Sequence, residues 1–261
     1  MYLIRSVLQL LFLTAMLAGC GGKSTNLISS SGDERQTVVL LHGLGRSTRA
    51  MAYLQYRLQE AGYETFSIGY PSTRLQPEEI LQLLRNKVHA CCASRKKVHF
   101  VGHSLGGVIV RALLQERRDI NLGRVVILGS PNQGTALVDW LADNRWFRVL
   151  AGPTGMRLGR GNNSWPKQLP APDYELGVIA GTHSANPIGS WILSGPDDGI
   201  VSVQSARLTG MKDFMLTPAG HVMMRYSDEV ADAVIQFLQS GSFPHELESR
   251  TGERYGMEGM E

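Results

Sequence analysis

The chain has 261 residues, of which 43% are hydrophobic and 19% are charged, so it can bury a sizeable core. Its 26 Lys and Arg residues against 23 Asp and Glu residues give a formal net charge of +3, and this weak balance argues against a nucleic-acid partner. Three cysteines exclude a disulfide-rich scaffold, and the Cys and His residues do not have the spacing of a zinc site. We therefore expect a globular fold that ordinary packing stabilises.

The first 20 residues predict an export signal rather than part of the fold. Arg5 precedes an apolar stretch at 7–17, and small residues lead to Cys20. A membrane-spanning helix is the alternative, but crossing a bilayer takes about 20 apolar residues, and Gly19 ends this stretch earlier. Residues 1–19 are therefore predicted to be a signal peptide.

Residues 17–20, Leu-Ala-Gly-Cys, resemble the lipobox of bacterial lipoproteins. The resemblance implies cleavage before Cys20 and lipidation of its thiol, so the mature chain would be exported and anchored to a membrane of the bacterial envelope. Gly21 rather than Asp follows the cysteine, which in Gram-negative lipoproteins implies passage to the outer membrane, facing the periplasm. Glycine, serine and polar residues dominate 20–35, which we interpret as a flexible tether.

Short apolar runs alternate with helical apolar spacing along residues 36–240. Strands are predicted at 37–41, 64–68, 98–101, 125–128, 175–181 and 213–216, and helices at 47–61, from 77 to about 88, at 105–117 and at 226–238. Because strands that alternate with helices form βαβ units, this pattern predicts an α/β domain with a mainly parallel sheet flanked by helices. Residues 241–261 are predicted to be a polar C-terminal tail. Cys91 and Cys92 are expected to be small packing residues, with a vicinal disulfide as the alternative.

The alternation of strands and helices fails between residues 132 and 174. This segment carries Trp140, Trp146 and Phe147 among many glycines and prolines. We interpret it as an insertion over one edge of the sheet, and its large aromatic residues need apolar partners. It is either a lid that closes over an acyl pocket or a small helical cap that packs rigidly.

Residues 102–106, Gly-His-Ser-Leu-Gly, match the G-x-S-x-G pattern of a nucleophile elbow. A pattern this short is weak by itself, and a serine in an ordinary turn is the structural alternative. Here it directly follows a predicted strand and opens a predicted helix, which is the setting that projects a serine from the sheet. We therefore predict that Ser104 is a nucleophile.

A serine hydroxyl needs a base to take its proton and an acid to orient that base. His221 follows the last strand, at the end of the sheet where ligand-facing loops collect, so we predict that it is the base. His183 and His245 are lesser candidates. For the acid, Asp197 and Asp198 stand together after the preceding strand, although both also fit a surface turn.

Several short segments in loops after predicted strands form a common pattern. They are His42-Gly43-Leu44, the elbow at 102–106, Gly129-Ser130-Pro131, Asp198-Gly199 and His221. In this order they resemble the α/β-hydrolase superfamily, specifically its lipase-like branch of bacterial esterases and lipases. The resemblance implies that Asp198 is the triad acid, and we expect Asp197 to point outward. It also implies an oxyanion hole formed by the backbone N–H groups of Leu44 and Leu105.

The sequence thus predicts a serine ester hydrolase of the esterase or lipase type, which acts through an acyl-enzyme on Ser104 and uses no cofactor. No metal site is expected, because Val222 stands where calcium-dependent bacterial lipases keep an acidic residue. The expected substrate is a small-molecule or lipid ester. Acyl transfer, or cleavage of an amide or thioester, is an alternative with the same triad. A non-catalytic envelope lipoprotein that uses the fold for binding is another.

Overall fold

A computed structural model describes residues 35–116 and 120–245. The chain divides into two units, residues 1–34 and 35–261, and the described residues all lie in the second. The predicted signal peptide, Cys20 and nearly all of the predicted tether therefore lie outside the described residues. Within the two described ranges, no helix is both long and apolar enough to cross a bilayer.

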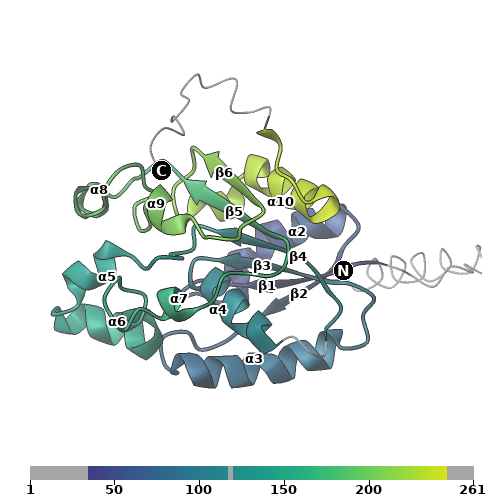
Figure 1. The fold of residues 1–261 in the computed structure, drawn as a ribbon, viewed down its shortest axis with the longest axis horizontal. Helices are drawn as coiled ribbons and strands as arrows, with labels where there is room; N and C mark the ends of the chain where they lie inside the picture. Colours follow the sequence, from purple (N-terminus) through teal and green to yellow (C-terminus); the bar gives the residue numbers. More distant parts are fainter. Residues whose placement is uncertain (1–34, 117–119, 246–261) are drawn as a thin grey trace, which may run out of the picture. The chain divides into compact units, whose positions relative to one another are not determined.

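Six parallel strands form one sheet in the order β2-β1-β3-β4-β5-β6 (Figure 1). The strands are β1 (Thr37–Leu41), β2 (Glu64–Ile68), β3 (Val98–His103), β4 (Leu122–Leu128), β5 (Leu176–Gly181) and β6 (Asp213–Thr217). The predicted parallel sheet is confirmed, and β3, β4 and β6 are longer than predicted.

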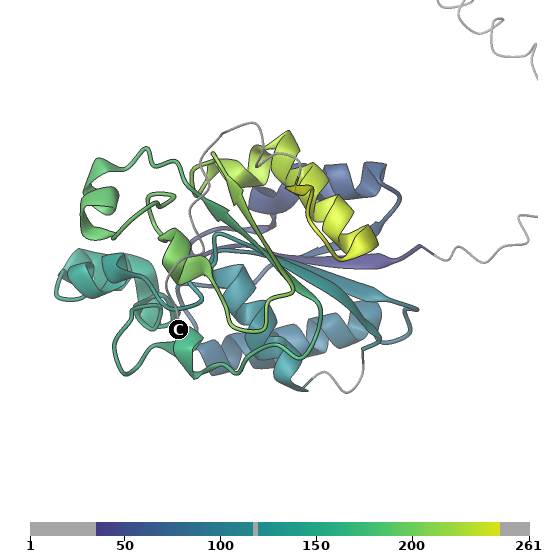
Figure 2. The same ribbon diagram turned by 45° about the horizontal axis from the view of Figure 1, so that its top comes forward.

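Helices cover both faces of the sheet (Figures 1 and 2). The helices α2 (Ala52–Glu60) and α10 (Asp228–Ser240) pack on one face, and α3 (Pro77–Cys92) and α4 (Leu105–Leu113) pack on the other. The remaining elements are shorter: η1 (Thr48–Met51), η2 (Leu114–Glu116), α5 (Ala136–Leu141), α6 (Arg145–Met156), α7 (Trp165–Gln168), α8 (Pro187–Ile192), α9 (Val203–Ala206) and η3 (Met223–Tyr226).

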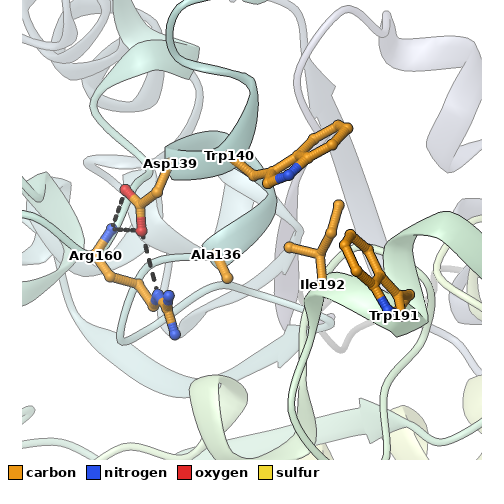
Figure 3. Close-up of a pocket in the computed structure, with 6 residues that line it drawn as sticks. All are labelled: Ala136, Asp139, Trp140, Arg160, Trp191 and Ile192. Carbon is orange, nitrogen blue, oxygen red and sulfur yellow. Dashed lines mark hydrogen bonds and ion pairs between the residues drawn. The ribbon is translucent and has the colours of Figure 1, made fainter.

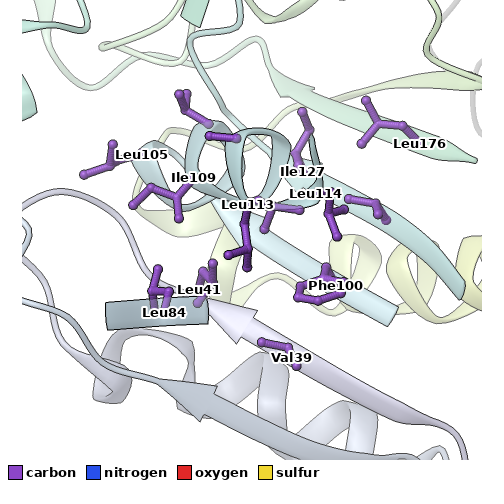
Figure 4. Packing of buried hydrophobic residues seen from close by; sticks show 14 of the residues in the cluster. Val39, Leu41, Leu84, Phe100, Leu105, Ile109, Leu113, Leu114, Ile127 and Leu176 are labelled. Atoms are coloured by element: carbon purple, nitrogen blue, oxygen red, sulfur yellow. The ribbon is translucent and has the colours of Figure 1, made fainter. Parts of the chain in front are cut away.

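The packing of strand β1 shows why residues 38–41 are all apolar. Val39 and Leu41 point into the core that α3 and α4 cover (Figure 4), whereas Val38 and Leu40 point into the core under α2 and α10. Neighbouring residues of a strand face opposite sides of the sheet, so a sheet covered on both sides needs apolar residues at every position. All four of these side chains are fully buried.

The register of the sheet brings the carboxyl ends of three central strands to one level. Leu41 of β1 pairs with Gly102 of β3, and Gly102 pairs with Ile127 of β4. The loops that follow these strands therefore start side by side. The segment 132–174 leaves the sheet at the carboxyl end of β4, contains α5, α6 and α7, and returns to the amino end of the parallel strand β5 (Figure 1). Its action as a lid stays a prediction.

Some local features differ from the sequence-based expectations. The predicted helix at 47–61 begins as the 3-10 turn η1, and α8 and α9 were not predicted. The predicted polar tail begins too early at 241, because Phe243 is buried and its ring lies 4.8 Å from that of Phe237. Cys91 and Cys92 are joined by a disulfide at the end of α3, so the expectation of plain packing residues is wrong.

Candidate active site

Ser104 lies at a sharp turn between β3 and α4 that its glycine neighbours permit. With a φ of 57° and a ψ of −123°, it is the one non-glycine residue with a positive φ among the described residues. A Cβ on Gly102 would lie 2.6 Å from Gly107 Cα, and a Cβ on Gly106 would collide with the carbonyl oxygen of Leu41. The two glycines of the elbow therefore allow the backbone to turn this closely.

The structure brings Ser104, His221 and Asp198 together in one chain of hydrogen bonds. Ser104 Oγ lies 3.0 Å from His221 Nε2, and His221 Nδ1 lies 2.8 Å from Asp198 Oδ2. With a neutral imidazole, the hydroxyl donates to Nε2 and Nδ1–H donates to the carboxylate. The side chains of Asp198 and His221 are 1% and 11% exposed, so this pair is shielded from most solvent.

Backbone groups hold Asp198 and His221 in this arrangement. The second carboxylate oxygen, Asp198 Oδ1, accepts hydrogen bonds from the N–H groups of Ile200 at 3.0 Å and Val201 at 2.8 Å. The His221 N–H donates to the carbonyl oxygen of Asp198 at 2.9 Å. Gly129 passes so close that a Cβ there would lie 2.9 Å from Asp198 Oδ2. Both carboxylate oxygens are thus oriented by neighbouring groups.

The expectation that Asp197 points outward is wrong. Its side chain is buried, and Oδ1 accepts hydrogen bonds from Ser190 Oγ at 3.0 Å and from the Gly199 N–H at 2.7 Å. Ser190 belongs to α8, a helix that was not predicted, so no hydrogen-bond donor to a buried Asp197 was expected. The two adjacent carboxylates bind different partners instead of sharing one site.

His103, the variable residue of the elbow, supports the loop that carries His221. Its Nε2 lies 2.8 Å from the carbonyl oxygen of His221, and the two imidazole rings are 4.9 Å apart. Burial holds the pKa of His103 well below its usual range, and the nearby His221 and Arg225 lower it further. The ring is therefore neutral, with Nε2–H as the donor. No role was predicted for His103, although its place directly before Ser104 could have indicated one.

The loop that follows β1 passes directly against Ser104. A Cβ on Gly43 would lie 3.1 Å from Ser104 Cβ, so a glycine permits this approach. The ring of His42 stacks on Tyr70 with a centroid distance of 4.2 Å, and Nδ1–H donates to the Gly43 carbonyl at 2.9 Å. Burial lowers the pKa of His42, which keeps this ring neutral. The stacked ring thus fixes the path of the loop.

Two backbone N–H groups remain available near the hydroxyl of Ser104. Within residues 35–116 and 120–245, neither the Leu44 N–H nor the Leu105 N–H has a hydrogen-bond acceptor. Leu105 is the first residue of α4, so its N–H belongs to the N-terminus of a helix, where an anion is favoured. The predicted oxyanion residues therefore keep free donors, Leu105 directly after Ser104 and Leu44 directly after Gly43, which approaches Ser104.

The other predicted bases lie elsewhere. His245 binds Asp213 with an Nε2–Oδ2 distance of 3.0 Å at the start of β6, which is the opposite end of the sheet. His183 follows β5, and among the described histidines it is His221 that bonds Ser104 Oγ. In the described ranges, no group of three or more His, Cys, Asp or Glu side chains is placed to hold a metal ion.

Comparison with known proteins identifies similar chains. Residues 37–157 match a family model described as palmitoyl protein thioesterase. The mature form of Bacillus licheniformis lipase BlEst2 is 20% identical with a TM-score of 0.63, over 80% of this chain and 94% of that one. Phospholipase PlaB from Legionella pneumophila, in complex with thio-NAD, is 16% identical with a TM-score of 0.64, over 80% and 59%. Esterase EaEST from Exiguobacterium antarcticum is 16% identical with a TM-score of 0.57, over 78% and 92%. No curated protein sequence matches the chain.

Proposed function

Because these similarities show that the chain has the α/β-hydrolase fold, we propose that it is a serine hydrolase that cleaves carboxylic esters. The observation that carries the proposal is the chain of hydrogen bonds from Ser104 through His221 to Asp198. A serine whose hydroxyl contacts a base, when that base is hydrogen-bonded to a carboxylate, has the arrangement of an activated nucleophile. The matched thioesterase family and the lipase, phospholipase and esterase with similar folds support an acyl substrate.

In the proposed reaction, Ser104 Oγ attacks the acyl carbonyl carbon while its proton passes to His221 Nε2. When the tetrahedral intermediate collapses, the ester C–O bond breaks and His221 gives this proton to the leaving alcohol. A water molecule, deprotonated by His221, then attacks the acyl-enzyme. When this second intermediate collapses, the bond between the acyl carbon and Ser104 Oγ breaks, His221 returns the proton to Oγ, and the acid is released. Throughout, Asp198 holds Nδ1–H in place and stabilises the positive imidazolium.

The N–H groups of Leu44 and Leu105 are proposed to stabilise the oxygen that becomes negative in each tetrahedral intermediate. Both donors belong to backbone that the fold fixes in advance, so little reorganisation accompanies the reaction. Removing one such donor from a serine hydrolase typically costs about 10²–10³-fold in kcat. The close approach that Gly43 permits is therefore proposed to matter for rate, not only for packing.

Replacing Ser104 by Ala tests this proposal. Hydrolysis of p-nitrophenyl esters is expected to fall about 10⁴-fold or more, and covalent labelling by a fluorophosphonate is expected to disappear. Ser94→Ala, at an exposed serine beyond α3, is the matched control and should keep both properties. Labelling of the Ser104→Ala variant at the wild-type level would refute the assignment. A folded wild-type protein that neither reacts nor hydrolyses would support the non-catalytic alternative.

Thioester cleavage is a second candidate, which the family match over residues 37–157 favours. The same triad serves, because only the leaving group changes from an alkoxide to a thiolate. Measuring kcat/KM for an oxygen ester and a thioester with the same acyl chain decides between the two. A thioester preference above about tenfold would change the substrate class and leave the role of Ser104 intact.

A further inference from the structure

Three short helices beyond the carboxyl ends of the strands expose large apolar side chains to solvent. We call these side chains the apolar rim, and each is more than half exposed: Trp140 of α5, Trp146, Val149 and Leu150 of α6, and Ile188 and Trp191 of α8. Trp191 is 79% exposed and Trp146 is 75% exposed. Single exposed apolar residues are ordinary, but a group that includes three indoles is typical of an interaction surface.

The rim residues belong to one surface. Helix α5 contacts both α6 and α8, and the three helices lie together in Figures 1 and 2. Trp140 and Trp191 line the same open pocket of about 480 Å³, with Ile192 between them in Figure 3. On the other side of this pocket, the Asp139 carboxylate binds Arg160 Nε at 3.2 Å. The indoles of Trp140 and Trp191 are thus neighbours, and Trp146 lies on a helix that contacts α5.

The first part of helix α6, before the backbone breaks at Gly152, has the reverse of the usual amphipathic pattern. Ala151 is buried at its end, and Thr154 and Gly155, which follow the break, are buried as well. A helix on a soluble domain normally presents polar residues on its outer face. Trp146, Val149 and Leu150 instead stand at i, i+3 and i+4 on the exposed side. A partner is needed to remove this face from water.

Two of the helices that carry the rim, α6 and α8, contact loops of the candidate active site. A Cβ on Gly155 of α6 would lie 2.7 Å from Leu44 Cδ2, so α6 packs on the loop of the proposed oxyanion hole. On the other side, Ser190 of α8 bonds Asp197, and Asn186 Nδ2 donates to the Gly199 carbonyl at 3.1 Å. A partner that covers the rim therefore lies next to the loops that position the candidate active site.

The charges around the rim indicate the kind of partner. Residues 136–160 contain four arginines and two acids, and one acid, Asp139, is already bound by Arg160. Arg145 and Arg148 are exposed beside Trp146 and form no ion pair with another described residue. Indoles favour the boundary between hydrocarbon and water, and arginines next to them bind lipid phosphates. We propose that the apolar rim docks on a phospholipid bilayer that carries anionic head groups, with the candidate active site facing the lipid.

A second copy of the chain fits this surface less well. A twofold dimer places the same patch on both sides of the interface, so Arg145 and Arg148 of the two copies would face each other with only the exposed Asp143 of each copy nearby to pair with them. An anionic bilayer instead supplies the opposite charge. The docking does not require that Ser104 reacts, so it can be tested independently of the proposed catalysis.

Tryptophan fluorescence in the full-length chain tests the docking. All proteins carry Ser104→Ala, so that catalysis cannot alter the vesicles, and quenching is measured with vesicles of brominated phosphatidylcholine, with and without phosphatidylglycerol. Leu150→Asp places a charge in the rim and keeps every tryptophan. Tyr56→Asp is the matched control, because Tyr56 is an exposed aromatic residue on α2, which covers the sheet far from the rim in sequence and packing. A lipid on Cys20 would act equally in both variants.

We expect anionic vesicles to quench the parent protein and the Tyr56→Asp protein alike, and the Leu150→Asp protein to need about tenfold more lipid. Replacing Arg145 and Arg148 together by Gln should remove the preference for phosphatidylglycerol. Absence of quenching in the parent protein, or equal quenching of the Leu150→Asp protein, would overturn the proposal. Sedimentation that shows a dimer dissociated by Leu150→Asp would assign the rim to a second copy and would also overturn it.

Discussion

His99 is expected to make the stability of the fold sensitive to acid. This residue lies in β3 and is fully buried. Its Nε2–H donates to Gln36 Oε1 at 2.6 Å, and its Nδ1 accepts a hydrogen bond from the Arg124 N–H at 2.9 Å. These two partners require a neutral ring, because a protonated Nδ1 cannot accept. Burial, with the positive charges of Lys97 and Arg124 as lesser causes, lowers the pKa of His99 to about 4.

The size of the effect follows from the difference between the folded and unfolded pKa values. A pKa that falls from 6.5 to about 4 corresponds to about 3 kcal/mol of folding free energy. Between these two values the unfolded chain binds a proton at His99 and the folded protein does not. The contribution of His99 to the free energy of unfolding is therefore fully present above pH 6.5. It is lost progressively as the pH falls from 6.5 toward about 4. At about pH 4.5 the expected loss is about 2.5 kcal/mol.

Urea unfolding of wild type and of His99→Gln, at about pH 7 and about pH 4.5, measures this loss. His99→Gln is less stable near neutrality, because one buried hydrogen bond is missing. Its free energy of unfolding should nevertheless fall about 2.5 kcal/mol less between the two pH values than that of wild type. His89→Gln, at an exposed histidine of α3, should behave as wild type. Equal pH dependence in wild type and His99→Gln would refute the reasoning.

Two further pairs of variants test the candidate site. Asp198→Asn should lower kcat for ester hydrolysis about 10⁴-fold, whereas Asp197→Asn should mainly lower the free energy of unfolding, by about 1–3 kcal/mol; equal kcat values for the two variants would contradict their different hydrogen-bond partners. Gly129→Ala places a Cβ 2.9 Å from Asp198 Oδ2 and should reduce kcat, whereas Gly62→Ala, at a positive φ with nothing within 4 Å, should lower only the melting temperature. A Gly129→Ala variant with wild-type kcat would show that this close approach is not needed.

The strands could be predicted because each buried position carries its own signal. In β1 residues 38–41 are all apolar, and this is the pattern that a sheet covered on both faces requires. The elbow could also be predicted, since its pattern is contained in the five residues 102–106, between a predicted strand and a predicted helix. By contrast, the order of the strands and the pairing of Leu41 with Gly102 depend on contacts between segments far apart in the chain. No local pattern encodes those contacts.

The loop around Asp197 shows where reasoning from local residue types failed. Two adjacent carboxylates suggest that one of them faces water, but Asp197 is buried because Ser190 and Gly199 donate to it. The donor Ser190 lies on α8, whose start has recognisable signals: Asn186 caps the helix through the Gly189 N–H, and Pro187 is the first helical residue. Helix α9, with four residues, is too short for a periodic pattern.

The surroundings of His103 explain why, in the proposed reaction, the proton that leaves Ser104 binds His221 and not His103. The ring of His103 lies 4.9 Å from that of His221, close enough to compete for the proton that leaves Ser104. Its Nε2–H already donates to the His221 carbonyl, so a second proton would have to bind Nδ1, a buried atom without a hydrogen-bond partner among the described residues. Burial lowers the pKa of His103, and the positive charge would therefore form only on His221, beside Asp198. In this position a neutral histidine orients the base through a hydrogen bond to the base's own backbone carbonyl.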